Sequence, residues 1–308
     1  MDDVRLLWIP VTISAAVCQC ARTALQKQLA ERLGNFGATY VRYLYGAPLA
    51  VVFLFVYLSH KGISFPELSG DLVAWSIAAG ISQIAGTWCL LKTFSSRNFA
   101  IGTLFGKTET VQVAILGTIV LGEALSFASW SAIVISTLGV ALIASRWVSP
   151  QIVGAVTSEW RSWTQPLLTG LASGLLFAVC AISVRAATLL LPSGDFLLSA
   201  LIVLAVMTVI QLMLMTVYTM LLDRPLLTLI AAMWRISTPV GILSVSGSLM
   251  WFVAIALETP SRVYTLGQIE VIFTLLVSRL YFRERLSRAA LAGCALITLG
   301  VLLLVSSR

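Results

Sequence analysis

Apolar runs of roughly 20 residues follow one another along the chain, and each is long enough for a helix to cross a lipid bilayer. Of the 308 residues, 59% are hydrophobic and only 11% are charged, whereas a typical soluble domain has about 25% charged residues. No water-soluble fold could bury so much apolar surface. The sequence therefore predicts an all-α, polytopic membrane protein, because a helix satisfies its own backbone hydrogen bonds in lipid.

Ten candidate spans are separated by charged residues or by Pro and Gly breaks. They cover residues 5–25, 36–58, 72–94, 99–121, 127–147, 166–190, 196–222, 238–257, 262–282 and 287–306. A polar break predicts a first five-helix repeat at 1–147, an interfacial linker at 148–165 and a second five-helix repeat at 166–308. The segment from Pro225 to Ser237 is either a separate interfacial helix or the beginning of the eighth span.

The second half repeats the first at a separation of 161 positions. Gly106, Glu109 and Glu123 fall on Gly267, Glu270 and Glu284, and the TLGV tetrad at 137–140 falls on a second at 298–301. Two glutamates at the same spacing from an identical tetrad are hard to obtain by chance. Because each half has five helices, the second enters the membrane the opposite way round, as in many secondary transporters.

The segments LGEALSFASWSAIVISTLGVALI and FRERLSRAALAGCALITLGVLLL close the two halves. With these motifs the chain resembles the drug/metabolite transporter superfamily, in its ten-helix form with two EamA-type halves. It departs from the family at Arg283, where a glycine is usual, and at Glu109-Thr110 and Glu270-Val271, where Glu-Pro is frequent. The resemblance implies a central cavity lined by helices one, three, four, six, eight and nine, and the export or exchange of small metabolites.

Three charged residues are predicted near the middle of the membrane, where a charge costs roughly 2.5–3.5 kcal/mol. Lys107 and Glu109 lie in the fourth span, and Glu270 has the equivalent position in the ninth. Residues two apart on a helix point in nearly opposite directions, so Lys107 and Glu109 cannot pair with each other. Either glutamate could take up a proton or bind an amino group, and Lys107 could pair with Glu270 or hold a substrate carboxylate. The alternative is a buried polar network that only fixes helix packing.

Further polar and aromatic residues complete the predicted cavity. They are Thr108, Gln112, Gln268, Gln83, Arg185, Trp88 and Tyr264. Arg185 lies deep in the sixth span, where it suits an anion-binding or gating role. Trp88 and Tyr264 could line the cavity, but aromatic residues also pack in cores or anchor helices at the membrane interface.

Other residues of the spans have predicted structural roles. Ser126 and Ser287 are expected to cap the fifth and tenth helices, and Gly139 and Gly300 are expected to let these helices pack closely. Arg22 and Arg42 are expected to reach the lipid headgroups by snorkelling.

These features favour a secondary transporter of small amphipathic metabolites such as amino acids, and more specifically an exporter that works by alternating access. Its expected partners are a small-molecule substrate, a coupling ion such as the proton, and the lipid bilayer. The sequence has no phosphate-binding loop for ATP hydrolysis, no basic groove for nucleic acid and no His-rich motif for a metal or cofactor. The alternatives are an intramembrane enzyme and a non-transporting receptor or assembly subunit.

The charges of the loops predict how the chain is oriented in the membrane. Basic residues concentrate in the loops opposite the termini, so the positive-inside rule predicts that both termini lie outside a bacterial inner membrane. A homodimer is compatible with the sequence.

Overall fold

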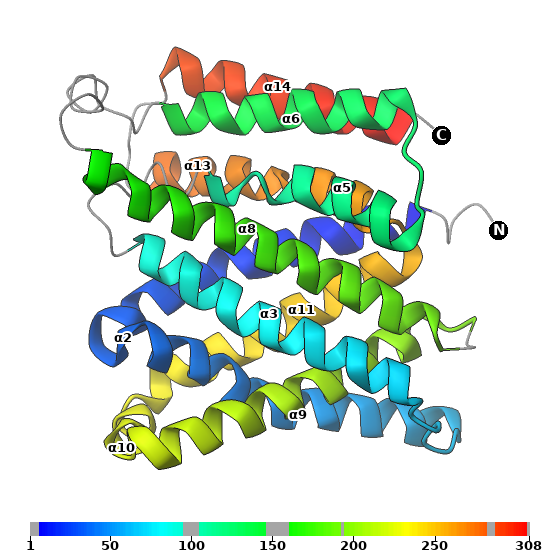
Figure 1. Ribbon diagram of the computed structural model, residues 1–308, viewed down its shortest axis with the longest axis vertical. Helices are drawn as coiled ribbons and strands as arrows, with labels where there is room; N and C mark the ends of the chain where they lie inside the picture. The colour runs from blue at the N-terminus through cyan, green and yellow to red at the C-terminus, as the bar shows by residue number, and fades with distance from the viewer. Residues whose placement is uncertain (1–5, 95–104, 146–159, 192–193, 282–286, 307–308) are drawn as a thin grey trace. The chain divides into compact units, whose positions relative to one another are not determined.

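The computed structural model describes residues 6–94, 105–145, 160–191, 194–281 and 287–306, and its regular elements are all α-helices (Figure 1). The helices are α2 (Trp8–Lys61), α3 (Gly70–Phe94), α5 (Glu109–Leu121), α6 (Phe127–Ser145), α8 (Trp160–Leu189), α9 (Phe196–Leu222), α10 (Pro225–Ala232), α11 (Trp234–Leu257), α12 (Pro260–Gly267), α13 (Ile269–Tyr281) and α14 (Arg288–Ser306). Seven of them are long and apolar enough to cross a membrane. The prediction of an all-α polytopic membrane protein is confirmed.

Helix α2 contains the first two predicted spans. Its 54 residues are interrupted at Gly34, where φ is 69° and ψ is 172°. A residue with a side chain rarely adopts such a positive φ, so glycine is needed at the point where one helix ends and the next begins. The kink therefore separates the two spans without a loop.

The segment from Pro225 to Ser237 is also settled. Residues 225–232 form the separate short helix α10, and α11 begins at Trp234, before the predicted start of the eighth span at 238. Met233 has φ −99° and ψ 21° and separates the two helices. Residues 225–232 thus form a helix of their own, as in the first alternative, whereas residues 234–237 begin the helix of the eighth span, as in the second.

The described helices form two compact units, and α3 and α8 contribute residues to both. Unit 1 comprises residues 1–84 and 179–259. Its helices α2 and α11 approach closely at two glycines, since a Cβ on Gly46 would lie 3.5 Å from the Gly241 carbonyl oxygen. A leucine-rich core beside them joins α2 to α9, with Leu54, Leu58, Leu198, Leu201, Ile202 and Ala205 buried.

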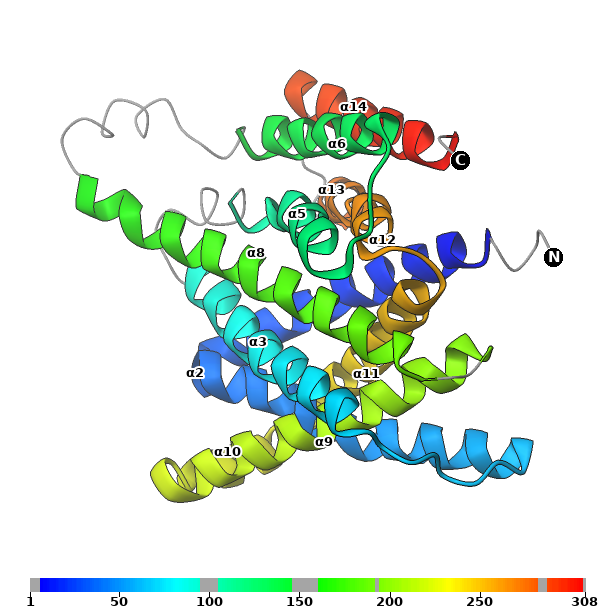
Figure 2. The ribbon, with the colours of Figure 1, turned by 45° about the vertical axis from the view of Figure 1, so that its right-hand side comes forward.

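Unit 2 comprises residues 85–178 and 260–308, and in it α6 and α14 run side by side (Figures 1 and 2). A Cβ on Gly139 would lie 2.7 Å from the Gly293 carbonyl oxygen, and a Cβ on Gly300 would lie 2.8 Å from that of Ala132. Each contact becomes the other when both of its residues are shifted by 161 positions. The closing helices of the two repeats therefore pack with the local pseudo-twofold symmetry that the repeat implies, and the predicted close packing is confirmed.

The predicted helix caps are present in unit 2. The amide of Ser129 donates to Ser126 Oγ at 3.1 Å, and the amide of Ala290 donates to Ser287 Oγ, also at 3.1 Å. Each serine satisfies one of the free amide groups at a helix start. The predicted roles of Ser126 and Ser287 are confirmed.

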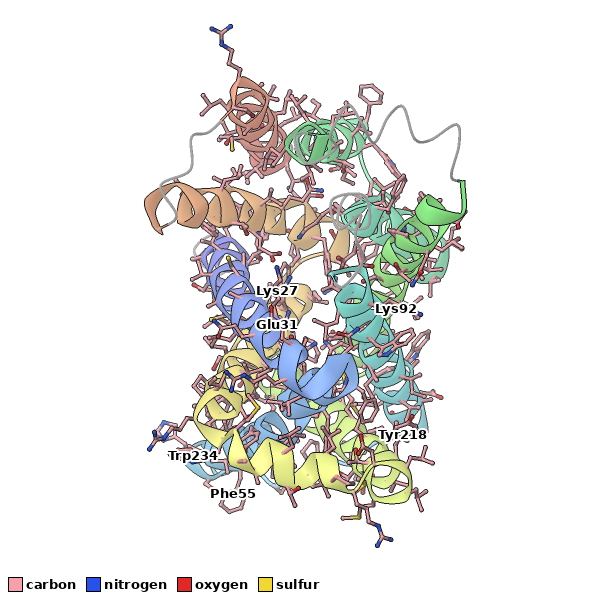
Figure 3. All side chains as sticks on the ribbon, turned by 90° about the vertical axis from the view of Figure 1, so that its left-hand side faces the viewer. Lys27, Glu31, Phe55, Lys92, Tyr218 and Trp234 are labelled. Carbon is pink, nitrogen blue, oxygen red and sulfur yellow. The ribbon has the colours of Figure 1, made fainter. Side chains whose placement is uncertain are left out.

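The outer faces of unit 1 carry large apolar side chains. Phe55 is 70% exposed, and Tyr218 and Trp234 are also exposed, as Figure 3 shows with all three labelled. Exposed apolar surface of this kind suits contact with lipid.

The prediction for two arginines is wrong, because Arg22 and Arg42 are buried within the protein and do not snorkel to the lipid headgroups. Arg22 instead donates to Gln26 Oε1 at 3.1 Å.

The pseudo-symmetric contact of α6 and α14 predicts that Gly300→Ala destabilises the protein. The added methyl group would press against the Ala132 carbonyl oxygen and lie 2.9 Å from the Ser136 Cβ. Overpacking of this kind costs about 1–3 kcal/mol, so thermal unfolding in detergent should begin at a lower temperature. Gly70→Ala is the matched control, because a Cβ at Gly70 meets open space. Equal unfolding temperatures for the two variants would contradict the proposed packing.

Candidate functional site

Two helix breaks in unit 2 occupy repeat-related positions. The first is a turn at Lys107 and Thr108, directly before α5 begins at Glu109. The second is Gln268, the residue between α12 and α13 and the repeat equivalent of Lys107. Helix breaks at membrane depth are found where the backbone is covered by protein or lines a polar cavity. The two breaks therefore mark a candidate functional site.

Neither break depends on proline, although the related family often has Glu-Pro next to these positions. At the first break the Thr108 hydroxyl donates to the Phe105 carbonyl oxygen at 2.6 Å. Gln112 Nε2 in turn donates to Thr108 Oγ1 at 2.9 Å. The first of these hydrogen bonds satisfies a backbone carbonyl group next to the break, and the second holds the Thr108 side chain in place.

An ion pair connects the two breaks. Lys107 Nζ lies 3.1 Å from Glu270 Oε2, and the two side chains are 28% and 13% exposed. Lys107 belongs to the first repeat, and Glu270 lies in the first turn of α13 in the second. The positive end of the α13 dipole also favours the negative charge of Glu270. The pairing that the sequence allowed is thus present, and it joins the two repeats.

Glu109 occupies the repeat-equivalent position in the first turn of α5. Within the described residues it takes part in no salt bridge. Helix α8 approaches it closely, because a Cβ on Gly174 would lie 3.2 Å from the Glu109 amide nitrogen and 3.0 Å from the Gly106 carbonyl oxygen. Gly174 is not among the residues predicted from sequence, although small residues are the ones that allow helices to approach so closely.

Two glutamines extend the polar patch in unit 2. Gln268 is 3% exposed, and its Nε2 donates to Thr137 Oγ1 of α6 at 3.3 Å. The Oε1 atoms of Gln112 and Gln268 are buried and have no hydrogen-bond partner among the described residues. Buried polar atoms usually have a partner, so these two oxygens are acceptors available to a bound solute or water.

The predicted aromatic residues of unit 2 differ in their surroundings. Trp88 is 41% exposed, and Lys92 Nζ lies 4.7 Å from the centre of its ring in a cation–π contact. Such a contact suits a residue near the end of a helix, where the lysine can remain hydrated. Tyr264 lies half-buried in α12, within one turn of the break at Gln268.

The two remaining candidates lie in unit 1. Gln83 Oε1 accepts a hydrogen bond from Gln211 Nε2 of α9 at 3.1 Å. Arg185 Nη1 donates to the carbonyl oxygens of Ile255 at 2.7 Å and Ala256 at 3.1 Å, at the C-terminal end of α11. A cation at that end of a helix satisfies free carbonyl groups and stabilises the helix dipole. Unit 2 thus contains eight of the ten predicted residues, while Gln83 and Arg185 lie in unit 1, where their partners are.

The model of the EamA-like transporter family matches twice, at residues 6–145 and 164–306. No curated protein matches. One solved structure, titled only as the crystal structure of a protein, has a TM-score of 0.71 and 12% sequence identity, with 96% of each chain covered. At that identity the likeness supports the fold alone.

The two family matches together cover most of the chain, including both helix breaks and the ion pair. They confirm the resemblance drawn from the closing motifs of the two halves, and they confirm that the protein acts in membrane transport. The chain is a multi-pass membrane protein that belongs to the EamA-like transporter family.

Proposed function

We propose that the protein is a secondary transporter that exports small amphipathic metabolites, such as amino acids, by alternating access in a bacterial inner membrane. The observation that carries this proposal is the Lys107–Glu270 ion pair, which joins the two repeats at their helix breaks. Inverted repeats with interrupted helices near the substrate are typical of secondary transporters. The concentration of basic residues in the loops opposite the termini supports an orientation with both termini outside.

The ion pair suits a zwitterionic substrate. An amino acid carries an ammonium group that can replace Lys107 next to Glu270, and a carboxylate that can replace Glu270 next to Lys107. Separating a partly buried pair without such a replacement leaves two charges poorly solvated. The substrate therefore lowers the cost of separating the repeats at this point, because it supplies both counter-charges at once.

This exchange of partners gives a coupling between binding and conformational change. With the pair intact, a direct contact holds the two repeats together at the breaks. With substrate bound, that contact is replaced by contacts to the solute, and the helices that begin at the two breaks can move relative to each other. A ligand shifts a conformational equilibrium only through different interaction energies in the two states, and the ion pair supplies such a difference.

Glu109 is the proposed proton-binding group. It has the same place in the first repeat as Glu270 has in the second, but among the described residues no salt bridge holds its charge. A carboxyl group inside a membrane protein that lacks a fixed counter-ion is suited to gain and lose a proton during transport. In this proposal Glu270 binds the substrate ammonium group and Glu109 couples transport to the proton gradient.

Removal of either partner of the ion pair should abolish most transport. We expect Glu270→Gln and Lys107→Met to reduce amino-acid counterflow in liposomes more than tenfold, and to lower the free energy of unfolding by about 3 kcal/mol, because each leaves one charge without its partner. The exchange variant Lys107→Glu/Glu270→Lys restores the pair, and it should recover stability without recovering transport. Recovery of both would reduce the pair to a structural contact, and unchanged counterflow in the single variants would contradict the proposal.

Substitution of Glu109, the proposed proton-binding residue, should remove coupling to the pH gradient while transport itself continues. We expect Glu109→Gln to retain counterflow between equal substrate concentrations but to lose acceleration by a pH gradient, since an amide cannot carry a proton across the cycle. The matched variant is the double substitution Glu109→Gln/Gln112→Glu, which restores a carboxyl group one helical turn away. The measurement is uptake of labelled amino acid into liposomes with and without an imposed pH gradient. An undiminished response to the gradient in Glu109→Gln would assign coupling to another group.

A further inference from the structure

The short helix α10 of unit 1 is flanked by exposed apolar and basic side chains. Leu221 and Leu222, at the end of α9, are 74% and 69% exposed, and Trp234, at the start of α11, is 57% exposed. The exposed Arg224 directly precedes α10, and the exposed Arg235 follows Trp234. We call the chain from Leu221 to Arg235 the α10 segment. Large apolar and basic side chains together on a surface are typical of a segment at the boundary between hydrocarbon and headgroups.

One face of α10 is fixed to the rest of unit 1. Leu226 is 6% exposed and Ile230 is fully buried, one helical turn further on. The contact with α2 is close, because a Cβ on Gly37 would lie 2.9 Å from Leu226 Cδ1. Gly37 lies directly after the break of α2 at Gly34, so α10 lies beside the turn of α2 (Figure 1). The exposed residues of the α10 segment are therefore held on a supported element.

The two arginines of the segment have hydrogen-bond donors to offer. Neither arginine takes part in a salt bridge within the described residues. Arg224 donates only its Nε, to the Met220 carbonyl oxygen at 2.8 Å, which leaves the donors of its two terminal nitrogens. The guanidinium carbon of Arg235 lies 5.8 Å from the centre of the Trp234 ring. Asp223 is the acidic residue of the segment, so two arginines and one aspartate leave it with a positive net charge.

We propose that the α10 segment binds the headgroup of an anionic phospholipid. A guanidinium can donate two parallel hydrogen bonds to phosphate oxygens, and Leu221, Leu222 and Trp234 are placed to contact the acyl chains of the same lipid. Figure 3 shows Trp234 at the outer edge of unit 1. A zwitterionic phospholipid has the same phosphate, but its own cation offsets the negative charge. The net positive charge of the segment therefore selects headgroups that lack a cation.

A lipid bound here would stabilise the fold of unit 1. Helix α10 joins α9 to α11 and packs on α2, so the bound lipid would contact the connection between these helices. This inference does not depend on which solute the protein transports. It concerns the outer surface of unit 1, whereas the proposed substrate site lies in unit 2.

The test is thermal unfolding of the full-length protein in a neutral detergent. The added ligands are phosphatidylglycerol, phosphatidylcholine with the same acyl chains, and soluble glycerol phosphate. A ligand that binds only the folded protein raises its unfolding temperature. We expect phosphatidylglycerol to raise the unfolding temperature more than phosphatidylcholine does at the same mole fraction. Glycerol phosphate at the same concentration should have no effect, because it has no acyl chains to contact the apolar residues.

Substitutions locate the effect on the α10 segment. Arg224→Gln and Arg235→Gln should each raise the phosphatidylglycerol concentration needed for half of the shift about fivefold. The double variant should respond equally to the two lipids. The matched control is Lys27→Gln/Arg32→Gln, which also removes two exposed basic residues from unit 1 but leaves the α10 segment unchanged. This control should retain the preference for phosphatidylglycerol.

Equal shifts by the two lipids in the unaltered protein would overturn the proposal, as would a preference that persists in Arg224→Gln/Arg235→Gln. Equal loss of the preference in Lys27→Gln/Arg32→Gln would also overturn it, since the attraction would then be a property of the general surface charge. A shift by glycerol phosphate as large as that by the lipid would indicate a site for soluble anions instead. None of these outcomes changes the liposome counterflow on which the proposed function is tested.

Discussion

A membrane-spanning backbone must satisfy its own hydrogen bonds, and most of this protein meets that requirement by remaining helical. The helical pattern is interrupted at the two breaks in unit 2, at Lys107 and at its repeat equivalent Gln268. At the first break, the Thr108 hydroxyl supplies part of the lost hydrogen bonding. The breaks have a second consequence, because each new helix begins next to a glutamate. Glu109 and Glu270 therefore lie at positive ends of helix dipoles, where a negative charge in the membrane is best tolerated.

The two repeats carry different residues at equivalent positions of the same backbone. Lys107 and Gln268 are equivalent positions, but only the first carries a charge, and that charge is paired with Glu270. The duplicated backbone thus provides two similar carboxylates, one with a fixed counter-ion and one without a salt bridge among the described residues. Divergence at a single position is enough to give the two glutamates different electrostatic environments. This difference is the physical basis for assigning them different roles in substrate binding and proton coupling.

Much of this arrangement could be predicted from sequence, because charges inside apolar runs and a repeat with fixed spacing are visible in the residues. The close packing at Gly139 and Gly300 followed from the same repeat. The burial of Arg42 could not be predicted from the repeat. An arginine near the end of a span either snorkels or turns inward according to the neighbouring helices, and tertiary packing decides which helices those are. The helix breaks were likewise hidden, because without proline they depend on side-chain hydrogen bonds such as that of Thr108.

The charges of unit 2 constrain the class of solute that the proposed function admits. The ion pair offers an acidic group, Glu270, and a basic group, Lys107, whose partners can be exchanged. A purely cationic solute would supply a counter-charge to Glu270 but none to Lys107, and a purely anionic solute would do the reverse. A zwitterion supplies both counter-charges at once. Selectivity for amino acids over cationic drugs would then follow from the placement of charges in the helices, without any requirement for a closely fitting side-chain pocket.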